Sequence, residues 1–256
     1  MAIHYKNERE IAALREAGRL VALTFQELEA AIKPGAVLRD LDDLATEFIE
    51  RSGAKPLYKG YQGSPPSHPP FPGTICSSVN AEICHGIPDG RALREGDIVG
   101  IDIGLRLNGF CGDACITFPV GRVSSEARRL LDVTRECLDL GIAAAQPGRQ
   151  LGAIGAAIQA HAEGNGFNVV RVWGGHGIGR QLHEPPSVAH VGPANHGPVI
   201  KPGMTFTIEP MINVGTGDWE MLDDGWTVVT ADGQLSAQFE HTLAITEDGP
   251  EILSIP

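Results

Sequence analysis

The sequence predicts an α/β protein of the α+β kind, in which two pseudo-symmetric halves each cover an antiparallel sheet with helices. Three observations predict this fold. Apolar residues recur with helical spacing in two separate pairs of segments. An Asn-Gly dipeptide joins two apolar runs, which is typical of a β-hairpin. A block of helix, Pro-Gly, helix and strands occurs twice along the chain, which indicates a duplicated unit.

Length and composition favour one large globular domain. The chain has 256 residues, of which 42% are hydrophobic, so it can bury a substantial core. The net charge of -12, with no cluster of Lys or Arg, argues against a nucleic-acid partner. No apolar run approaches the length of a membrane span, and no secretion signal is recognisable, so we expect a cytoplasmic protein without a membrane partner. The five dispersed cysteines include no Cys-x-x-Cys pair, so we expect reduced thiols.

The first half begins with two predicted helices. Apolar residues recur every three or four positions over residues 7–32, where Asn7 and Glu10 form a capping-box pattern. Pro34-Gly35 ends this helix, and a second helix runs from Leu38 to near Gly53. Residues 55–73 then contain six prolines, which predicts a long loop at a functional rim or a flexible segment.

A strand at 75–79 is followed by a hairpin around Asn108-Gly109, which brings two carboxylates together. If these two residues form the turn, Gly104 faces Asp113, and Asp102 lies on the same face of the sheet as Gly104. Asp102 and Asp113 are then diagonal neighbours, roughly 7–8 Å apart. Like charges at this separation indicate a cation between them. The alternative is a bulge that shifts the pairing and turns one aspartate to solvent.

The second half repeats this order of elements. We expect a helix over about 125–145, a stop at Pro147-Gly148, and a helix from Leu151 to about Gly164. The remaining strands are predicted at about 167–173, 204–213, 226–231 and 236–246.

Two local matches support the duplication. Pro34-Gly35 and Pro147-Gly148 occupy equivalent places, and the segment Gly96 to Asp102 matches the segment Gly203 to Glu209. We therefore expect halves at about 7–121 and 122–250 within one domain over 1–256, with Asp102 and Glu209 equivalent about a pseudo-twofold axis. Chance similarity of two strands that each place an acid after apolar residues is the alternative.

A histidine and two further acids extend the candidate site. His176 lies among glycines directly after an apolar strand, whereas Glu209 and Glu240 lie on apolar strands. A lone loop histidine is most often solvated, and a half-buried acid is most often salt-bridged. The strands concerned contain almost no basic residues, Arg106 being the exception. Four carboxylates and one imidazole form a ligand set for two divalent cations.

Several motifs, in this order and spacing, closely resemble the type I methionine aminopeptidases. The similarity runs from the first helix almost to the C-terminus. The motifs are Cys84-His85-Gly86-Ile87-Pro88, Gly112-Asp113, Gly175-His176-Gly177-Ile178-Gly179, the segment Lys201 to Pro210, and the segment Ser236 to Thr242.

The resemblance implies a pita-bread fold that removes the initiator methionine from nascent chains. It implies that Asp102 binds one of two divalent ions (Co, Mn, Fe or Zn), that His176 and Glu209 bind the other, and that Asp113 and Glu240 bridge them. A water between the two ions would be the nucleophile, with Glu209 as general base.

Further residues receive roles from the same resemblance. His85 and His183 match two histidines that contact the scissile amide of the substrate. Phe71, Cys76 and Trp226 are positioned to line the methionine pocket, with Leu182 and Met211 close by, although an ordinary core also contains such residues. Asn80 and Ser236 resemble an accessory site for a monovalent cation. Two departures are Leu182, where the family commonly has an aromatic residue, and an apparent insertion at 63–70.

The expected partners are polypeptide N-termini that begin with methionine and a small second residue, with ribosome contact and a monomeric state also expected. One rival function is an X-Pro dipeptidase, for which 256 residues leave no room for an added N-terminal domain. The other is an inactive binding protein, which would have lost at least one metal ligand. We expect five remaining histidines to be solvated, and these are His4, His68, His161, His190 and His196.

Overall fold

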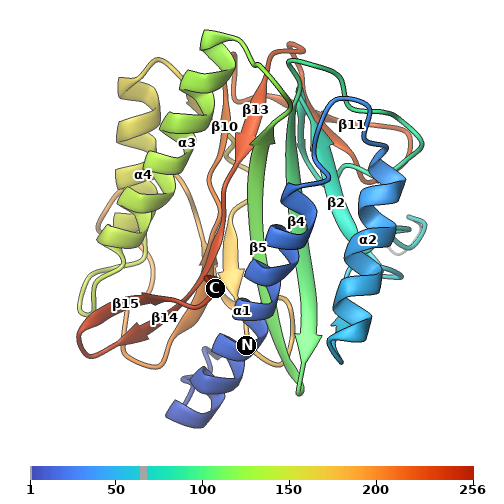
Figure 1. Cartoon of the computed structure of the whole chain (residues 1–256). Coiled ribbons are helices and arrows are strands. Elements are labelled where there is room, and N and C mark those ends of the chain that lie inside the picture. Colours follow the sequence, from blue (N-terminus) through green and yellow to red (C-terminus); the bar gives the residue numbers. More distant parts are fainter. Residues whose placement is uncertain (1, 64–67) are drawn as a thin grey trace.

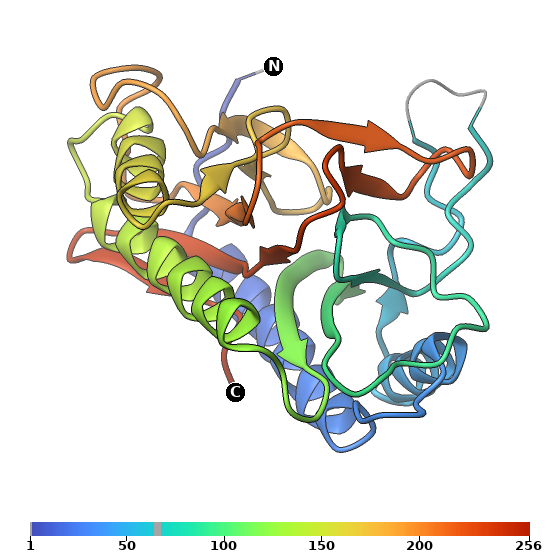
Figure 2. The ribbon, with the colours of Figure 1, turned by 90° about the horizontal axis from the view of Figure 1, so that it is seen from above.

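The computed structural model describes residues 2–63 and 68–256, in which four helices pack in two pairs against antiparallel sheets. Helices α1 (Glu8–Glu29) and α2 (Leu38–Arg51) lie together beside β4 and β5, whereas α3 (Ser125–Ala144) and α4 (Gly152–Gly164) lie together against the strands of the second half (Figure 1). Seen from above, both helix pairs border the same side of the strands (Figure 2). The predicted α/β architecture with antiparallel sheets is confirmed.

The helices begin where the capping residues predict. The side chain of Asn7 accepts hydrogen bonds at the start of α1, and Glu10 completes the capping box. Ser124 accepts from the backbone N–H of Ala127 at the start of α3. The first helix ends at Glu29, a few residues earlier than the predicted 32, because a turn precedes Pro34.

The first sheet contains the predicted hairpin in the predicted register. It consists of β1 (Lys55–Pro56), β2 (Ile75–Val79), β4 (Ile98–Leu107) and β5 (Phe110–Pro119). Gly104 pairs with Asp113, and Asp102 pairs with Cys115. The turn has φ of 51° at Asn108 and 84° at Gly109, as a type I′ turn requires. Asp102 and Asp113 therefore share one face of the sheet, and the bulged alternative is wrong.

The other strands form three smaller sheets. One has the order β15, β14, β9, β7, β8, a second has β13, β10, β6, and a third has β11, β12, β3. Their bounds are β3 (Glu82–Cys84), β6 (Asn168–Val169), β7 (Gly175–Gly177), β8 (Glu184–Val188), β9 (Thr205–Ile208), β10 (Met211–Asn213), β11 (Trp219–Met221), β12 (Val228–Thr230), β13 (Ser236–Gln238), β14 (His241–Thr246) and β15 (Gly249–Ile252).

Two long strands expected from the sequence are each divided at a functional acid. The segment 204–213 separates into β9 and β10 at Glu209-Pro210, because proline has no N–H for a sheet ladder. The segment 236–246 separates into β13 and β14 at Phe239-Glu240. The strand expected at 167–173 is only β6, and the one expected at 226–231 is β12.

The break at Phe239-Glu240 joins the two halves of the molecule. The backbone N–H of Glu240 donates to the carbonyl of Cys115 in β5 over 2.8 Å. Ile116 and Phe239 form an isolated antiparallel bridge beside this bond. Glu240 therefore lies against the strand that carries Asp113, although 127 positions separate them in the sequence.

Two apolar clusters support the sheets from the helix side. One lies among α1, α2, β2, β4 and β5, and the other lies among α3, α4 and the strands of the second half. Ile116 packs against both clusters. The cores thus hold the helix side of the sheets rigid and leave the opposite side for the site.

The proline-rich segment 55–73 is mostly loop, as predicted, apart from β1 at its start. Residues 64–67, within the predicted insertion 63–70, lie outside the described residues. Among the helices that the structure describes, none combines the length and the apolarity that a membrane span requires.

Candidate metal centre

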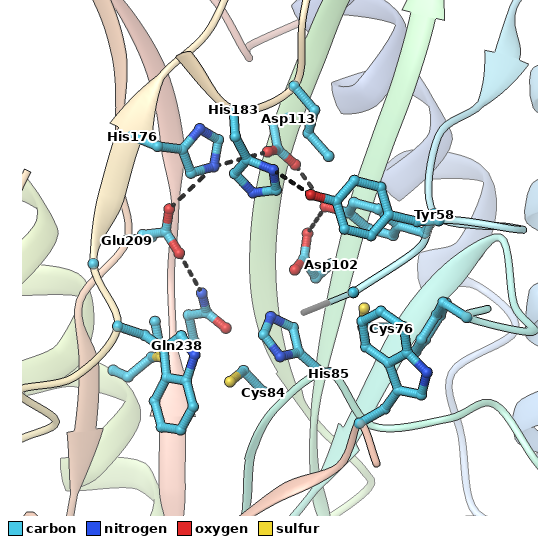
Figure 3. A pocket seen from close by; sticks show the side chains of 18 of the residues that line it. Tyr58, Cys76, Cys84, His85, Asp102, Asp113, His176, His183, Glu209 and Gln238 are labelled. Carbon is cyan, nitrogen blue, oxygen red and sulfur yellow. Dashed lines mark hydrogen bonds and ion pairs between the residues drawn. The ribbon is translucent and has the colours of Figure 1, made fainter. Parts of the chain in front are cut away.

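A cavity of about 430 Å³ opens where strands of both halves meet. All twelve residues that the sequence analysis places in the catalytic, metal-binding or methionine-binding groups line it. They are Phe71, Cys76, His85, Asp102, Asp113, His176, Leu182, His183, Glu209, Met211, Trp226 and Glu240. Figure 3 shows the polar members facing one another across the cavity.

The hairpin supplies two of the carboxylates. Asp102 on β4 and Asp113 on β5 both point to one phenol, that of Tyr58, which approaches from the segment after β1 (Figure 3). The hydroxyl of Tyr58 lies 2.5 Å from Oδ1 of Asp102 and 2.7 Å from Oδ1 of Asp113. The diagonal register therefore places both carboxylates within reach of a single atom.

His176 is held with one ring nitrogen free. It lies at the centre of β7, and Gly175 lets this strand approach β9 so closely that a Cβ would lie 2.1 Å from the carbonyl oxygen of Thr207. Nδ1 of His176 lies 3.1 Å from the carbonyl oxygen of Gly177, so Nδ1 must carry the proton. The unprotonated Nε2 then faces Oδ2 of Asp113 at 3.5 Å and Oε1 of Glu209 at 3.6 Å.

Glu209 is fixed at both carboxylate oxygens. The hydroxyl of Thr207 donates to Oε1 over 2.8 Å, and the amide of Gln238 donates to Oε2 over 3.3 Å. The same Thr207 hydroxyl accepts the backbone N–H of His176. This chain of bonds ties the orientation of Glu209 to the position of His176.

Glu240 has a carboxylate oxygen without any partner. Its side chain is 2% exposed, and Oε1 accepts no hydrogen bond from the described residues. Ligand atoms of Glu240, Asp113 and His176 all lie within 4.8 Å of one another. An orphaned buried oxygen in this position is costly unless a cation binds it.

The cavity strongly disfavours negative charge. Burial raises the pKa of Asp102 to about 7 and that of Glu209 to about 8. Burial, together with the charge of Asp102, raises the pKa of Asp113 well above its ordinary value. Burial and the charge of Asp113 have the same effect on Glu240. These carboxylates therefore need positive charge to ionise together at neutral pH.

The lining residues fit divalent cations as that positive charge. No Lys or Arg is among the described residues that line the cavity. Burial lowers the pKa of His176 to about 3, so its imidazole is neutral and its lone pair is free. Oxygen ligands with one imidazole suit divalent metal ions. The donor set thus matches a divalent metal site.

His85 and His183 lie beside this cluster without joining it. His85 follows β3 with φ of 57° and has Trp173 and Trp226 at edge-to-face geometry, each with ring centroids 6.5 Å away. Burial lowers the pKa of His85 to about 4. The ring of His183 lies 4.2 Å from that of His176, between centroids. Burial also lowers the pKa of His183, so both rings are neutral where they line the cavity.

One wall of the cavity is apolar. Phe71 packs edge to face on Trp226 with ring centroids 5.2 Å apart. Cys76 pairs with Asp102 across β2 and β4, so its thiol borders the carboxylates. Leu182 and Met211 are buried and also line the cavity. Apolar side chains next to acids suit a ligand that has a free amino group and a flexible, unbranched apolar side chain.

Asn80 and Ser236 lie outside this lining. The backbone N–H of Ser236 donates to the carbonyl of Asn80, and the hydroxyl of Ser236 is buried without a partner among the described residues. The two residues are therefore neighbours, as expected from the sequence.

Sequence reasoning missed three residues of the site. Tyr58 and Gln238 contact the acids directly, and their only sequence signals were the glycine at 104 and the place of Gln238 two residues before Glu240. His190, predicted to be solvated, is 2% exposed, and its Nε2 accepts from the N–H groups of Gly175 and Glu209. That prediction was wrong because its segment packs against α4, where Gly155 leaves no room for a Cβ.

Comparisons with known proteins agree with this geometry. Residues 12–247 match metallopeptidase family M24. The "Methionine aminopeptidase 1" of Bacillus subtilis is 51% identical over 249 residues, which cover 97% of this chain and 98% of that protein. The chain belongs to the methionine aminopeptidases of family M24. It is therefore a metalloaminopeptidase, and its site uses a divalent metal.

Solved structures give the same result for the fold. The crystal structure of methionine aminopeptidase from Rickettsia prowazekii has a TM-score of 0.95 and 42% identity, covering 99% of this chain and 100% of that one. The Xaa-Pro dipeptidase from Bacillus anthracis has a TM-score of 0.75 at 21% identity, covering 98% of this chain and 61% of that one. This second likeness shows a shared fold, which is the pita-bread fold of the methionine aminopeptidases.

Proposed function

We propose that this chain removes the N-terminal methionine from peptides and nascent proteins with two divalent ions bound in the cavity. The observation that carries the proposal is the convergence of Asp113, His176 and Glu240 within 4.8 Å, with Asp102 and Glu209 beside them. This arrangement supports the assignment from sequence. Asp102 would hold one ion, His176 and Glu209 the other, and Asp113 and Glu240 both.

Bound divalent ions would acidify a water molecule and polarise the scissile carbonyl. Glu209 would accept the proton of the attacking water, because its two carboxylate oxygens are already oriented by Thr207 and Gln238. The neutral rings of His85 and His183 would donate N–H groups to the substrate amide and to the oxyanion that develops from it.

Substrate selection would divide between charge and shape. The free α-amine of the substrate is positive and would lie against the acidic cluster, so only a chain terminus would fit. The methionine side chain would lie along Phe71, Cys76, Leu182, Met211 and Trp226. A small second residue is expected from the resemblance to the methionine aminopeptidases. The Asn80 and Ser236 pair remains a proposed monovalent cation site.

The test uses chelated protein reloaded with Mn²⁺ or Co²⁺. We expect release of methionine from Met-Gly-Met, and none from its N-acetylated form, which lacks the amine. Leu-Gly-Met tests the shape of the pocket and should be cleaved far more slowly. Absence of methionine release from loaded, folded protein would instead support the binding-protein alternative. Cytoplasmic location, ribosome contact and a monomeric state stay predictions from the sequence.

A further inference from the structure

Tyr58 makes the shortest polar contacts in the cavity, although the proposed reaction gives it no task. Its hydroxyl is 2.5 Å from Oδ1 of Asp102 and 2.7 Å from Oδ1 of Asp113. A hydroxyl has one proton, so it can donate to only one of these oxygens at a time. The phenol therefore gives a hydrogen bond to only one of the two carboxylates at any time.

The backbone aims this hydroxyl at the acids. Residues Lys55 and Pro56 pair with β4, and the N–H of Leu57 donates to the carbonyl of Gly104 over 2.9 Å. The ring of Tyr58 then lies against Gly104, where a Cβ would be 2.6 Å from Cε1 of the ring. Phe71 packs edge to face with the ring of Tyr58, with centroids 6.4 Å apart. The position of the phenol is therefore set by strand pairing and by the glycine beneath it.

We propose that Tyr58 is a positioning residue whose hydroxyl bridges Asp102 and Asp113 in the ion-free enzyme and competes with a divalent ion for the space between them. This inference rests on the proposed function, because it assumes that these two aspartates hold an ion. An ion compensates both carboxylates, whereas the phenol compensates one. Loading of this position thus displaces the hydroxyl, and loading of the position at His176 and Glu209 does not.

The competition gives the two ion positions unequal affinities. The phenol contacts Oδ1 of Asp102, which would hold one ion only, and Oδ1 of the bridging Asp113, whose other oxygen, Oδ2, faces His176. Its described hydrogen bonds do not include His176 or Glu209, which would hold the other ion. The position at Asp102 should therefore bind its ion more weakly. Removal of the hydroxyl should selectively tighten that weaker position.

The experiment is a Mn²⁺ titration of chelated full-length protein, followed by calorimetry and by the EPR signal of free Mn²⁺. It compares the natural chain with Tyr58→Phe, which keeps the ring over Gly104. We expect the weaker dissociation constant to fall about tenfold in Tyr58→Phe, the size that one hydrogen bond to a charged group accounts for. The tighter constant should stay within about twofold.

Tyr61→Phe is the matched control, because it removes another phenol hydroxyl from the same cavity. That hydroxyl contacts Nδ1 of His183 and none of the five proposed ligands. Both Mn²⁺ constants should therefore be unchanged in this variant. Equal tightening in Tyr61→Phe would overturn the specific role of Tyr58.

Thermal unfolding provides a readout that is independent of activity. Chelated Tyr58→Phe should melt below the chelated natural chain, because the bridge is lost, and saturating Mn²⁺ should remove the difference. Unchanged or weakened Mn²⁺ binding in Tyr58→Phe would overturn the inference, and weakened binding would identify the phenol as a supporting ligand instead. A natural chain that binds no Mn²⁺ or releases no methionine would contradict the proposed function itself.

Discussion

Asp113 is the residue on which the other polar groups of the cavity converge. Its side chain faces the phenol of Tyr58 and the free nitrogen of His176, and its pKa is raised by burial and by the charge of Asp102. The burial of Asp113 therefore has opposite effects in the ion-free and the ion-bound protein. The carboxylate is costly without ions and is the shared ligand when ions are bound.

Asp113→Ala should therefore abolish ion binding at both positions while making the chelated protein slightly more stable. Loss of a residue that only supports a metal ligand lowers affinity or activity by up to about a hundredfold. Loss of the bridging ligand itself should therefore lower kcat/KM by at least that much. Calorimetric Mn²⁺ titration and thermal unfolding of the chelated chain measure the two effects. Asp132→Ala, on the exposed side of α3, is the control and should change neither. Full activity of Asp113→Ala would remove Asp113 from its proposed role.

His190 supports the site from behind without facing the cavity. One nitrogen, Nε2, accepts two backbone N–H groups, those of Gly175 and Glu209. Burial lowers the pKa of His190 to about 3, so the ring stays neutral and keeps this acceptor. Positions of both His176 and Glu209 thus depend on one buried ring.

His190→Leu should destabilise the fold by about 2–3 kcal/mol, because two buried N–H groups lose their acceptor. His190→Gln offers an amide oxygen to the same groups and should recover part of the loss. Urea unfolding of the chelated variants gives the free energies. Equal stability of the Leu variant and the natural chain would show that these two hydrogen bonds contribute nothing.

The sequence predicted which acids and which histidine meet in the cavity better than it predicted the residues that support them. Acids and a histidine in strands without basic partners are recognisable in one sequence, because burying an unpaired charge is unfavourable unless a ligand compensates it. Tyr58 and His190 carry no such mark. Tyr58 lies in a loop without periodicity, and His190 lies between Ala189 and Val191 in a segment that packs against Gly155 of α4. Their roles depend on contacts between distant segments, which spacing does not encode.

At the level of elements, the hairpin was predictable residue by residue, whereas the strands near Glu209 and Glu240 were not. A type I′ turn fixes the register of its strands, and alternation then fixes the faces. The break between β13 and β14 depends on contact with a distant strand, because the backbone N–H of Glu240 donates to the carbonyl of Cys115 in β5. Strand β7 has the sequence Gly-His-Gly and lacks any propensity signal.

Thr117 holds the junction between the halves. Its hydroxyl accepts the N–H of Gln238 over 3.0 Å and donates to the carbonyl of the same residue over 2.7 Å, and all three groups are buried. Thr117→Val keeps the shape, removes the hydroxyl that the N–H of Gln238 donates to, and leaves the carbonyl of Gln238 with only the Cys115 thiol at 3.9 Å. We expect a loss of about 2 kcal/mol in unfolding free energy and weaker Mn²⁺ binding, because Glu240 follows two residues later.

Thr134→Val is the matched control for this junction. Thr134 is also fully buried, but its hydroxyl donates only to the carbonyl of Leu130 within α3, which keeps its helical bond. This variant should lose less stability and should bind Mn²⁺ as the natural chain does. Normal Mn²⁺ binding by folded Thr117→Val would separate the junction from the site and contradict the prediction.

At the scale of the whole molecule, we propose that the two halves at about 7–121 and 122–250 are related by duplication. Each has two helices packed on an antiparallel sheet, and each contributes an acid to the shared cavity at the matched positions Asp102 and Glu209. The cavity therefore forms only when both halves fold. Ion binding is in this way linked to the stability of the whole chain.

That linkage has a sign that follows from the pKa values. Asp102 and Glu209 have pKa values of about 7 and 8 in the folded chain and about 4 when unfolded, so the folded chelated protein binds more protons in between. Its stability therefore falls as pH rises through this window. His176 and His190, with pKa values lowered to about 3, act oppositely, but only below their ordinary value of 6.5. Above pH 6.5 the opposing effect of the buried histidines fades, and the carboxylates dominate the slope because Asp113 and Glu240 also have raised pKa values.

The stabilisation that ions provide should consequently grow between pH 6.5 and pH 8. Chelated protein should lose ~2 kcal/mol over this range, roughly 4–8 °C in Tm for a chain of this size, as the buried carboxylates ionise. Protein saturated with Mn²⁺ should show little change, because the ions already hold the carboxylates ionised. Differential scanning calorimetry of both forms at the two pH values measures the difference. Glu209→Gln, which removes one of the titrating groups, should flatten the slope of the chelated form. A gap between the two forms that stays constant or narrows with pH would show that these acids do not bind the ions.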